Sequence, residues 1–224
     1  MTERERKSSN ESSQRSTRMC TEPKFAGPLD PELVRAAALH LRSKPLVLDV
    51  KKMAPDAEGK MKKLADGVRA EEGRALARLG DGGWDPLVQS GKRAGAFDDQ
   101  LVAAAAEAIR TWHPAISYVT AMPSLRTGAL VPDFAARLAS ALGLPYEALL
   151  ERSGENPPQR EMANSAQQVA NVRGQFRVVS PPPQSGCLLV DDVRFSGWTL
   201  AMVAGQLRRQ GATAVYPFAL STAF

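Results

Sequence analysis

The chain has 224 residues, of which 43% are hydrophobic, enough for one large domain or one domain with an appendage. Its 29 lysine and arginine residues against 24 aspartate and glutamate residues give a net charge of +5, which permits nucleic acid or phosphorylated ligands as partners and requires neither. No apolar run approaches the ~18 residues of a membrane-spanning helix, so we expect no membrane partner.

The sequence shows neither a secretory signal nor a cysteine spacing typical of a disulfide scaffold or a metal site. Residues 1–19 are polar and lack the apolar centre of a secretory signal. Cys20 and Cys187 lie far apart and give no metal-ligand spacing, which makes a disulfide scaffold or a zinc finger a poor interpretation. We therefore expect a cytoplasmic protein.

The first 24 residues mix serine with arginine and lysine and show no apolar periodicity. Such a segment has too little apolar surface to offset its chain entropy, so residues 1–24 are predicted to form a disordered arm. A solvated tail is the preferred interpretation, and an arm that touches nucleic acid is the alternative.

Residues 25–95 are predicted to form a mostly helical extension. Asp30 and Pro31 mark a helix start, Leu46–Leu48 has the pattern of a short strand, and 70–79 is helical by pattern and ends at Gly80. A basic cluster precedes this last segment and is interpreted as a solvated face, with DNA contact as the alternative, because acidic residues are interleaved with it. The cluster consists of Lys51, Lys52, Lys60, Lys62 and Lys63.

From residue 96 to 224, strand and helix patterns alternate. Asp98 is placed to cap a helix that runs to about Trp112. The predicted elements that follow are a strand within 115–121, a helix over 131–142, a strand over 186–193, a helix over 199–210 and a strand over 213–220. This order predicts an α/β domain with a right-handed crossover and a parallel sheet flanked by helices.

One segment of this domain, residues 187–200, carries a chemical pattern. An apolar strand ends in Asp191 and Asp192, a short turn contains Ser196 and Gly197, and a helix begins near Thr199. Ligands of open α/β sheets bind beyond the carboxyl ends of the strands, and a helix start offers unpaired N–H groups to an anion. Acids for sugar hydroxyls beside a phosphate cradle predict a sugar phosphate ligand, whereas the plainer alternative is a strand-to-turn junction with solvated acids.

This segment resembles the phosphoribosyl pyrophosphate (PRPP) motif of type I phosphoribosyltransferases. The resemblance implies that fold, with residues 25–95 as its hood, and ribose contacts by Asp191 and Asp192 as catalytic residues. It also implies PRPP as substrate, with Mg²⁺ bridging its phosphate oxygens, and Arg126 after the first strand as the catalytic residue beside pyrophosphate. The implied ribose 5-phosphate loop consists of Val193, Arg194, Phe195, Ser196, Gly197, Trp198 and Thr199.

Two further resemblances widen the first. Gln167, Gln168 and the run 171–176 are similar to the segment before the PRPP loop in ComF-like phosphoribosyltransferases. Residues 45–220 resemble the C-terminal region of RecQ-type DNA helicases of high-GC bacteria, on the runs 45–48, 51–53, 70–79, 164–167 and 191–199. This implies a helicase motor domain as partner and a role in DNA repair, although the chain itself has no ATP-binding Gly-x-x-x-x-Gly-Lys loop.

The loop departs from the family pattern at two bulky residues. Phe195 and Trp198 occupy positions where small residues are typical, and Trp198 is interpreted equally as a plug of the cleft or as a stacking platform. The sequence therefore leaves two alternatives, a domain that catalyses phosphoribosyl transfer and one that does not. The alternatives to a PRPP-binding domain are a catalytically inactive module that contacts DNA or regulates a helicase, and a truncated gene product with no independent role.

Overall fold

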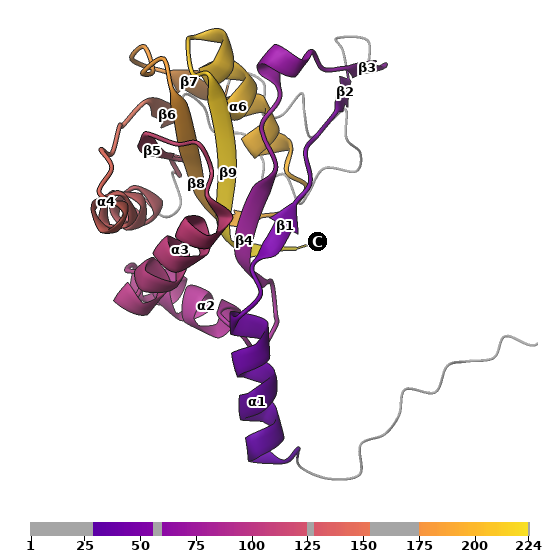
Figure 1. Cartoon of the computed structure of the whole chain (residues 1–224), viewed down its shortest axis with the longest axis vertical. Coiled ribbons are helices and arrows are strands. Elements are labelled where there is room, and N and C mark those ends of the chain that lie inside the picture. The colour runs from indigo at the N-terminus through magenta and orange to yellow at the C-terminus, as the bar shows by residue number, and fades with distance from the viewer. Residues whose placement is uncertain (1–28, 56–59, 125–127, 153–174, 224) are drawn as a thin grey trace, which may run out of the picture.

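A computed structural model describes residues 29–55, 60–124, 128–152 and 175–223. Its centre is a five-stranded sheet in the order β1-β4-β9-β8-β5 (Figure 1). The outer strand β1 is antiparallel to β4, and the other neighbours are parallel. The bounds are β1 Leu46–Leu48, β4 Gly73–Arg78, β5 Tyr118–Ala121, β8 Gly186–Arg194 and β9 Ala214–Thr222. The parallel-dominated α/β sheet expected from the strand and helix alternation is confirmed.

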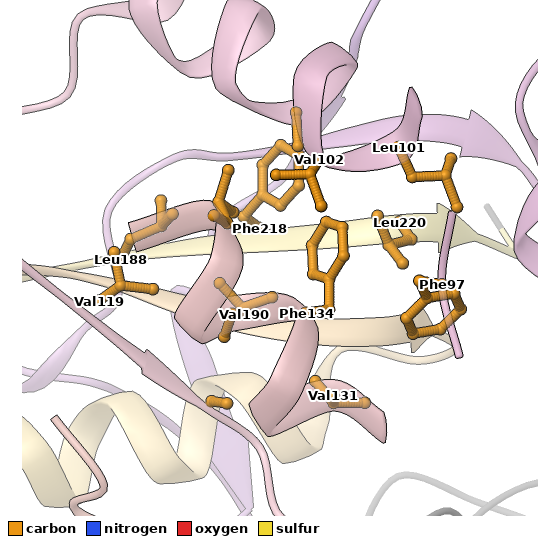
Figure 2. Packing of buried hydrophobic residues seen from close by; sticks show 14 of the residues in the cluster. Phe97, Leu101, Val102, Val119, Val131, Phe134, Leu188, Val190, Phe218 and Leu220 are labelled. Carbon is orange, nitrogen blue, oxygen red and sulfur yellow. The ribbon is translucent and has the colours of Figure 1, made fainter. Parts of the chain in front are cut away.

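Helices cover both faces of this sheet, and β8 shows the division residue by residue. Leu188 and Val190 belong to the cluster formed with α3 and α4, which Figure 2 shows around Phe134, Leu101 and Phe218. Cys187 and Leu189 belong to a second cluster, formed with α6. The bounds are α2 Asp85–Ala94, α3 Asp99–Trp112, α4 Leu130–Leu142 and α6 Trp198–Arg209. Because side chains alternate along a strand, every second residue of β8 faces α6.

Local signals set several of the element ends as expected. The Asp98 carboxylate accepts a hydrogen bond from the Gln100 N–H at 2.8 Å and caps α3. Asp30 caps α1 (Pro31–Arg42) in the same way through the Glu32 N–H. Gly143 takes a left-handed φ of 70° after the last residue of α4, a conformation that glycine adopts without strain.

The helix predicted over residues 70–79 is wrong: this segment contains β4. Gly73 leaves no room for a side chain beside the Pro217 carbonyl, and Ala75, Leu76 and Ala77 are buried. β4 is held between β1 and β9, so sheet pairing on both sides outweighs the helical preference of this alanine- and arginine-rich stretch. Sequence reasoning also missed α2.

The segment before α3 thus contributes to the sheet. The described part of residues 25–95 holds α1, α2 and β1 to β4, with β1 and β4 in the central sheet. β2 (Met53–Pro55) and β3 (Met61–Lys63) pair as a separate antiparallel hairpin. α1 has no buried residue and extends away from the sheet in Figure 1. The predicted arm, residues 1–24, lies outside the described residues, and none of the described helices is long and apolar enough to cross a membrane.

Candidate functional site

The predicted phosphate loop connects β8 to α6. β8 continues through both aspartates to Arg194, residues 195–197 form bends, and α6 begins at Trp198. Gly197 precedes the helix with a left-handed φ of 77° and brings no side-chain cap, so the first N–H groups of α6 are left to other acceptors. The junction is therefore a strand end followed by a helix start, as the sequence predicted, and the structure adds that no side chain caps this helix.

Because side chains alternate along a strand, the Cβ atoms of the two predicted acids point to opposite faces of the sheet, while their carboxyl groups stay within hydrogen-bond reach of each other at the strand end. Asp191 lines a pocket on the α6 side together with the loop. Asp192 lies on the other side, where its carboxylate is 2.6 Å from the Lys92 ammonium of α2. Each carboxylate accepts a hydrogen bond from the next backbone N–H: the Asp192 N–H donates to Asp191 Oδ1 at 2.9 Å, and the Val193 N–H donates to Asp192 Oδ1 at 2.6 Å. The structure thus brings one of the two acids, Asp191, to the loop.

The pKa of Asp191 lies well above the usual range for an aspartate. The main cause is desolvation by burial, and the negative charge of Asp192 and a side-chain hydrogen bond with Asp192 add to it. The Asp192 N–H and the Lys92 ammonium oppose the shift without cancelling it. A carboxyl group of this kind keeps a proton to higher pH and can donate as well as accept hydrogen bonds to a hydroxyl.

The pocket beside Asp191 has a volume of about 50 Å³. One water molecule needs ~10–15 Å³ on this measure, so the space suits a small polar group such as a tetrahedral oxyanion. The lining residues are Asp191, Val193, Arg194, Phe195, Gly197, Thr199 and Leu200. Six of the ten predicted site residues therefore share one hollow.

Arg194 supplies the fixed positive charge in this wall. Its guanidinium lies close to Gly197, because a Cβ added to that glycine would be 2.8 Å from Arg194 Nε. The Nη1 group of Arg194 donates a hydrogen bond to the Thr222 hydroxyl at 3.4 Å. Burial lowers the pKa of Arg194, and the carboxylate of Asp49 raises it. An arginine stays charged under these conditions, so the pocket combines a guanidinium with a helix start, both of which favour an anion.

The two bulky residues of the loop have different positions. The Trp198 side chain is buried against Ala54 and Leu64, on the side of α6 away from the pocket, so it does not plug the pocket. The Lys51 ammonium covers its ring at 4.8 Å from the centroid. Phe195 is 40% exposed at the pocket wall. Ser196 is half-buried and is not part of the pocket lining.

The remaining predicted site groups are only partly covered by the structure. Arg126 and the run 164–174 lie outside the described residues. The residues that are described contain no group of three histidine, cysteine, aspartate or glutamate side chains placed to hold a metal ion. The pocket offers one carboxylate, with a raised pKa, beside a guanidinium, and this donor set does not fit a resident Mg²⁺, which prefers several oxygen ligands.

Sequence reasoning missed three charged residues that surround the loop. Lys92 approaches from α2, and Asp49 and Lys51 approach from the segment after β1. Each is separated by about 100 residues or more from the loop, so no local pattern joins them to it. The basic cluster in the sequence contained Lys51 but did not distinguish it from its neighbours.

Comparisons with known proteins add fold-level likenesses only. No protein-family model and no curated protein matches the chain. Among solved structures, a purine phosphoribosyltransferase from Pyrococcus horikoshii is 19% identical, with 55% of this chain and 72% of that chain covered and a TM-score of 0.37. An adenine phosphoribosyltransferase from Saccharomyces cerevisiae is 15% identical, with coverage of 84% and 89% and a TM-score of 0.39.

An orotate phosphoribosyltransferase from Aeropyrum pernix is similar at the same level. It is 17% identical, with 85% of this chain and 81% of that chain covered and a TM-score of 0.36.

Proposed function

We propose that this chain binds a ribose 5-phosphate ligand, such as PRPP, at the β8–α6 loop. The observation that carries the proposal is the shared pocket: Asp191, the Arg194 guanidinium and the uncapped start of α6 border one hollow of about 50 Å³. An anion suits the guanidinium and the helix N–H groups, and a hydroxyl suits the carboxyl group. A sugar phosphate carries both groups within one small molecule.

Each residue has a defined part in this proposal. Arg194 and the backbone of residues 195–199 hold the 5-phosphate, and Asp191 holds a ribose hydroxyl. Asp192 acts indirectly in this proposal, because it is not part of the pocket lining and its carboxylate is in an ion pair with Lys92. Mg²⁺ would arrive on the phosphate oxygens of PRPP rather than reside on the protein. Arg126 is the residue we assign to the pyrophosphate group, should the chain catalyse phosphoribosyl transfer.

Calorimetric titration tests this function. We expect PRPP with Mg²⁺ to bind saturably, ribose 5-phosphate to bind without the metal ion, and ribose to bind far more weakly. Arg194→Met should weaken the two phosphorylated ligands about 10- to 100-fold, the loss of a hydrogen bond to a charged group. Arg110→Met, which removes an exposed arginine on α3, is the matched control. Equal binding to the Arg194 variant and the unsubstituted chain would contradict the proposal.

A second candidate function is supported by the β2–β3 hairpin. Lys60, Lys62 and Lys63 are exposed on it. A basic, exposed hairpin suits the phosphate backbone of DNA, and residues 45–220 resemble the C-terminal region of RecQ-type helicases. The chain would then be a catalytically inactive accessory module of a helicase.

Salt dependence separates the two candidates. If the hairpin contacts DNA, retention of a duplex should fall steeply with salt, and replacing Lys60, Lys62 and Lys63 by glutamine should flatten that slope by about one per lost phosphate contact. The Arg194→Met variant should retain DNA normally. DNA retention with no sugar phosphate binding would favour the second candidate over the first.

A further inference from the structure

The segment that follows β1 lies against the phosphate loop. Asp49 and Lys51 border a small cavity of about 20 Å³ whose opposite wall is made by Arg194, Gly197 and Leu200. Those three residues also border the larger pocket that contains Asp191. Arg194 and Gly197 therefore stand between the two hollows, and residues about 145 positions apart in the sequence meet at the start of α6.

Lys51 is held close to the loop by the first residue of α6. Its ammonium lies 4.8 Å from the centroid of the Trp198 ring, and Trp198 follows Gly197 directly. The Lys51 side chain is half-buried, whereas that of Lys52 is exposed. The two neighbouring lysines thus differ in position, and only Lys51 borders the cavity beside the loop.

The charges around this cavity leave a positive excess. Lys51 and Arg194 each carry one positive charge, and Asp49 is the carboxylate that acts on both. Burial lowers the pKa of Lys51, the Arg194 charge lowers it further, and Asp49 opposes them. Glu71 also borders the cavity, but its carboxylate accepts a hydrogen bond from Arg208 at 2.8 Å. Two desolvated cations facing one shared acid favour an additional anion.

We propose that Lys51 is a second cationic ligand for the phosphate group of the sugar phosphate, reaching it across Gly197 from the segment after β1. The inference rests on the proposed function. In the unliganded chain Lys51 rests on the Trp198 ring, and its flexible stem lets the ammonium exchange this contact for the stronger charge-assisted bond to phosphate. The N-terminal part of the chain would then complete the phosphate site.

The test compares Lys51→Met with Lys52→Met, a matched neighbour that removes the same charge. The probe is ribose 5-phosphate, titrated by calorimetry, with ribose as the uncharged control. We expect Lys51→Met to weaken ribose 5-phosphate about tenfold and to leave the weak binding of ribose unchanged. Lys52→Met should bind both like the unsubstituted chain.

A spectroscopic readout reports the predicted movement. The chain has three tryptophans, so a Trp84→Phe/Trp112→Phe variant leaves Trp198 as the reporter. Ribose 5-phosphate should change the Trp198 emission as the ammonium leaves the ring, and adding Lys51→Met should abolish that change. Circular dichroism checks that each variant is folded, and a misfolded double variant is replaced by the two single Trp→Phe variants.

The outcomes separate the two proposals. If the unsubstituted chain binds neither PRPP nor ribose 5-phosphate, the proposed function fails and this inference fails with it. If the unsubstituted chain binds ribose 5-phosphate and Lys51→Met binds it equally well, only the role of Lys51 is overturned. Equal weakening by Lys51→Met and Lys52→Met also overturns it, because a general charge effect then suffices.

Discussion

The two faces of β8 place two adjacent aspartates in different surroundings, one beside a pocket and the other in an ion pair. On the α6 face, Asp191 borders a pocket and has a raised pKa, and it forms no salt bridge with a lysine or arginine among the described residues. On the α2 face, Asp192 is held at 2.6 Å by Lys92. The first arrangement keeps a carboxyl group available to a ligand, and the second stabilises the strand end that carries it. One residue of register decides which acid has which role.

The largest expected effect is the loss of stability when the ion pair between Lys92 and Asp192 is broken. Lys92→Met should lower the free energy of unfolding by about 2 kcal/mol, because the Asp192 carboxylate loses its partner while only 16% of its side chain is exposed. The partial exposure of Lys92, at 29%, keeps the cost below that of a fully buried pair. Urea denaturation at pH 7 measures it.

The control for this change is the double variant Lys92→Met/Asp192→Asn. It removes the unpaired charge together with its partner and should recover most of the lost stability. A single variant as stable as the unsubstituted chain would mean that the ion pair does not distinguish the two faces.

The loop on the pocket face should respond to Gly197→Ala. The left-handed φ of 77° strains any residue with a side chain, and the new Cβ would lie 2.8 Å from Arg194 Nε. We expect a loss of about 1–2 kcal/mol in stability and weaker binding of ribose 5-phosphate, since Arg194 must move. Thermal unfolding and calorimetry measure the two effects.

Gly67→Ala is the matched control for the loop variant. Gly67 has open space where its Cβ would lie and no positive φ, so alanine there should be neutral or slightly stabilising. A similar loss at both glycines would show that the loop conformation is not the cause.

A smaller and opposite effect is expected for Asp191→Asn. Because the folded-state pKa of Asp191 is raised, folding favours its protonated form, and stability is lost as pH rises through that pKa. Asparagine has no such loss, so the variant should be more stable than the unsubstituted chain at pH 8. The difference should shrink towards pH 4.

Melting temperatures across this pH range test the sign. An Asp191→Asn variant that is less stable at pH 8, with the gap closing at pH 4, would show that the carboxylate is stabilised and not desolvated. The same variant should bind ribose 5-phosphate more weakly, so that stability and binding change in opposite directions at this position.

The last and smallest prediction concerns the reactivity of the Cys187 thiol, which is buried on the α6 face of β8. Burial raises the pKa of this thiol to about 12. We expect no alkylation of Cys187 by iodoacetamide at pH 8 in the folded chain and full alkylation in urea, followed by peptide mass spectrometry. Rapid modification of the folded chain would indicate that the α6 face opens.

Sequence alone determined the features that depend on neighbouring residues. Asp98 and Asp30 cap the helices they were expected to cap, and the segment from Asp191 to Thr199 runs from a strand through a turn into a helix as predicted, because caps, turns and apolar periodicity are local properties. Tertiary structure decided the rest. β4 is a strand because β1 and β9 pair with it, Asp192 is in an ion pair because α2 brings Lys92 to within 2.6 Å of it, and Lys51 differs from Lys52 because it meets α6. Each of these contacts joins distant parts of the chain, and no short-range pattern carries information about which distant groups meet.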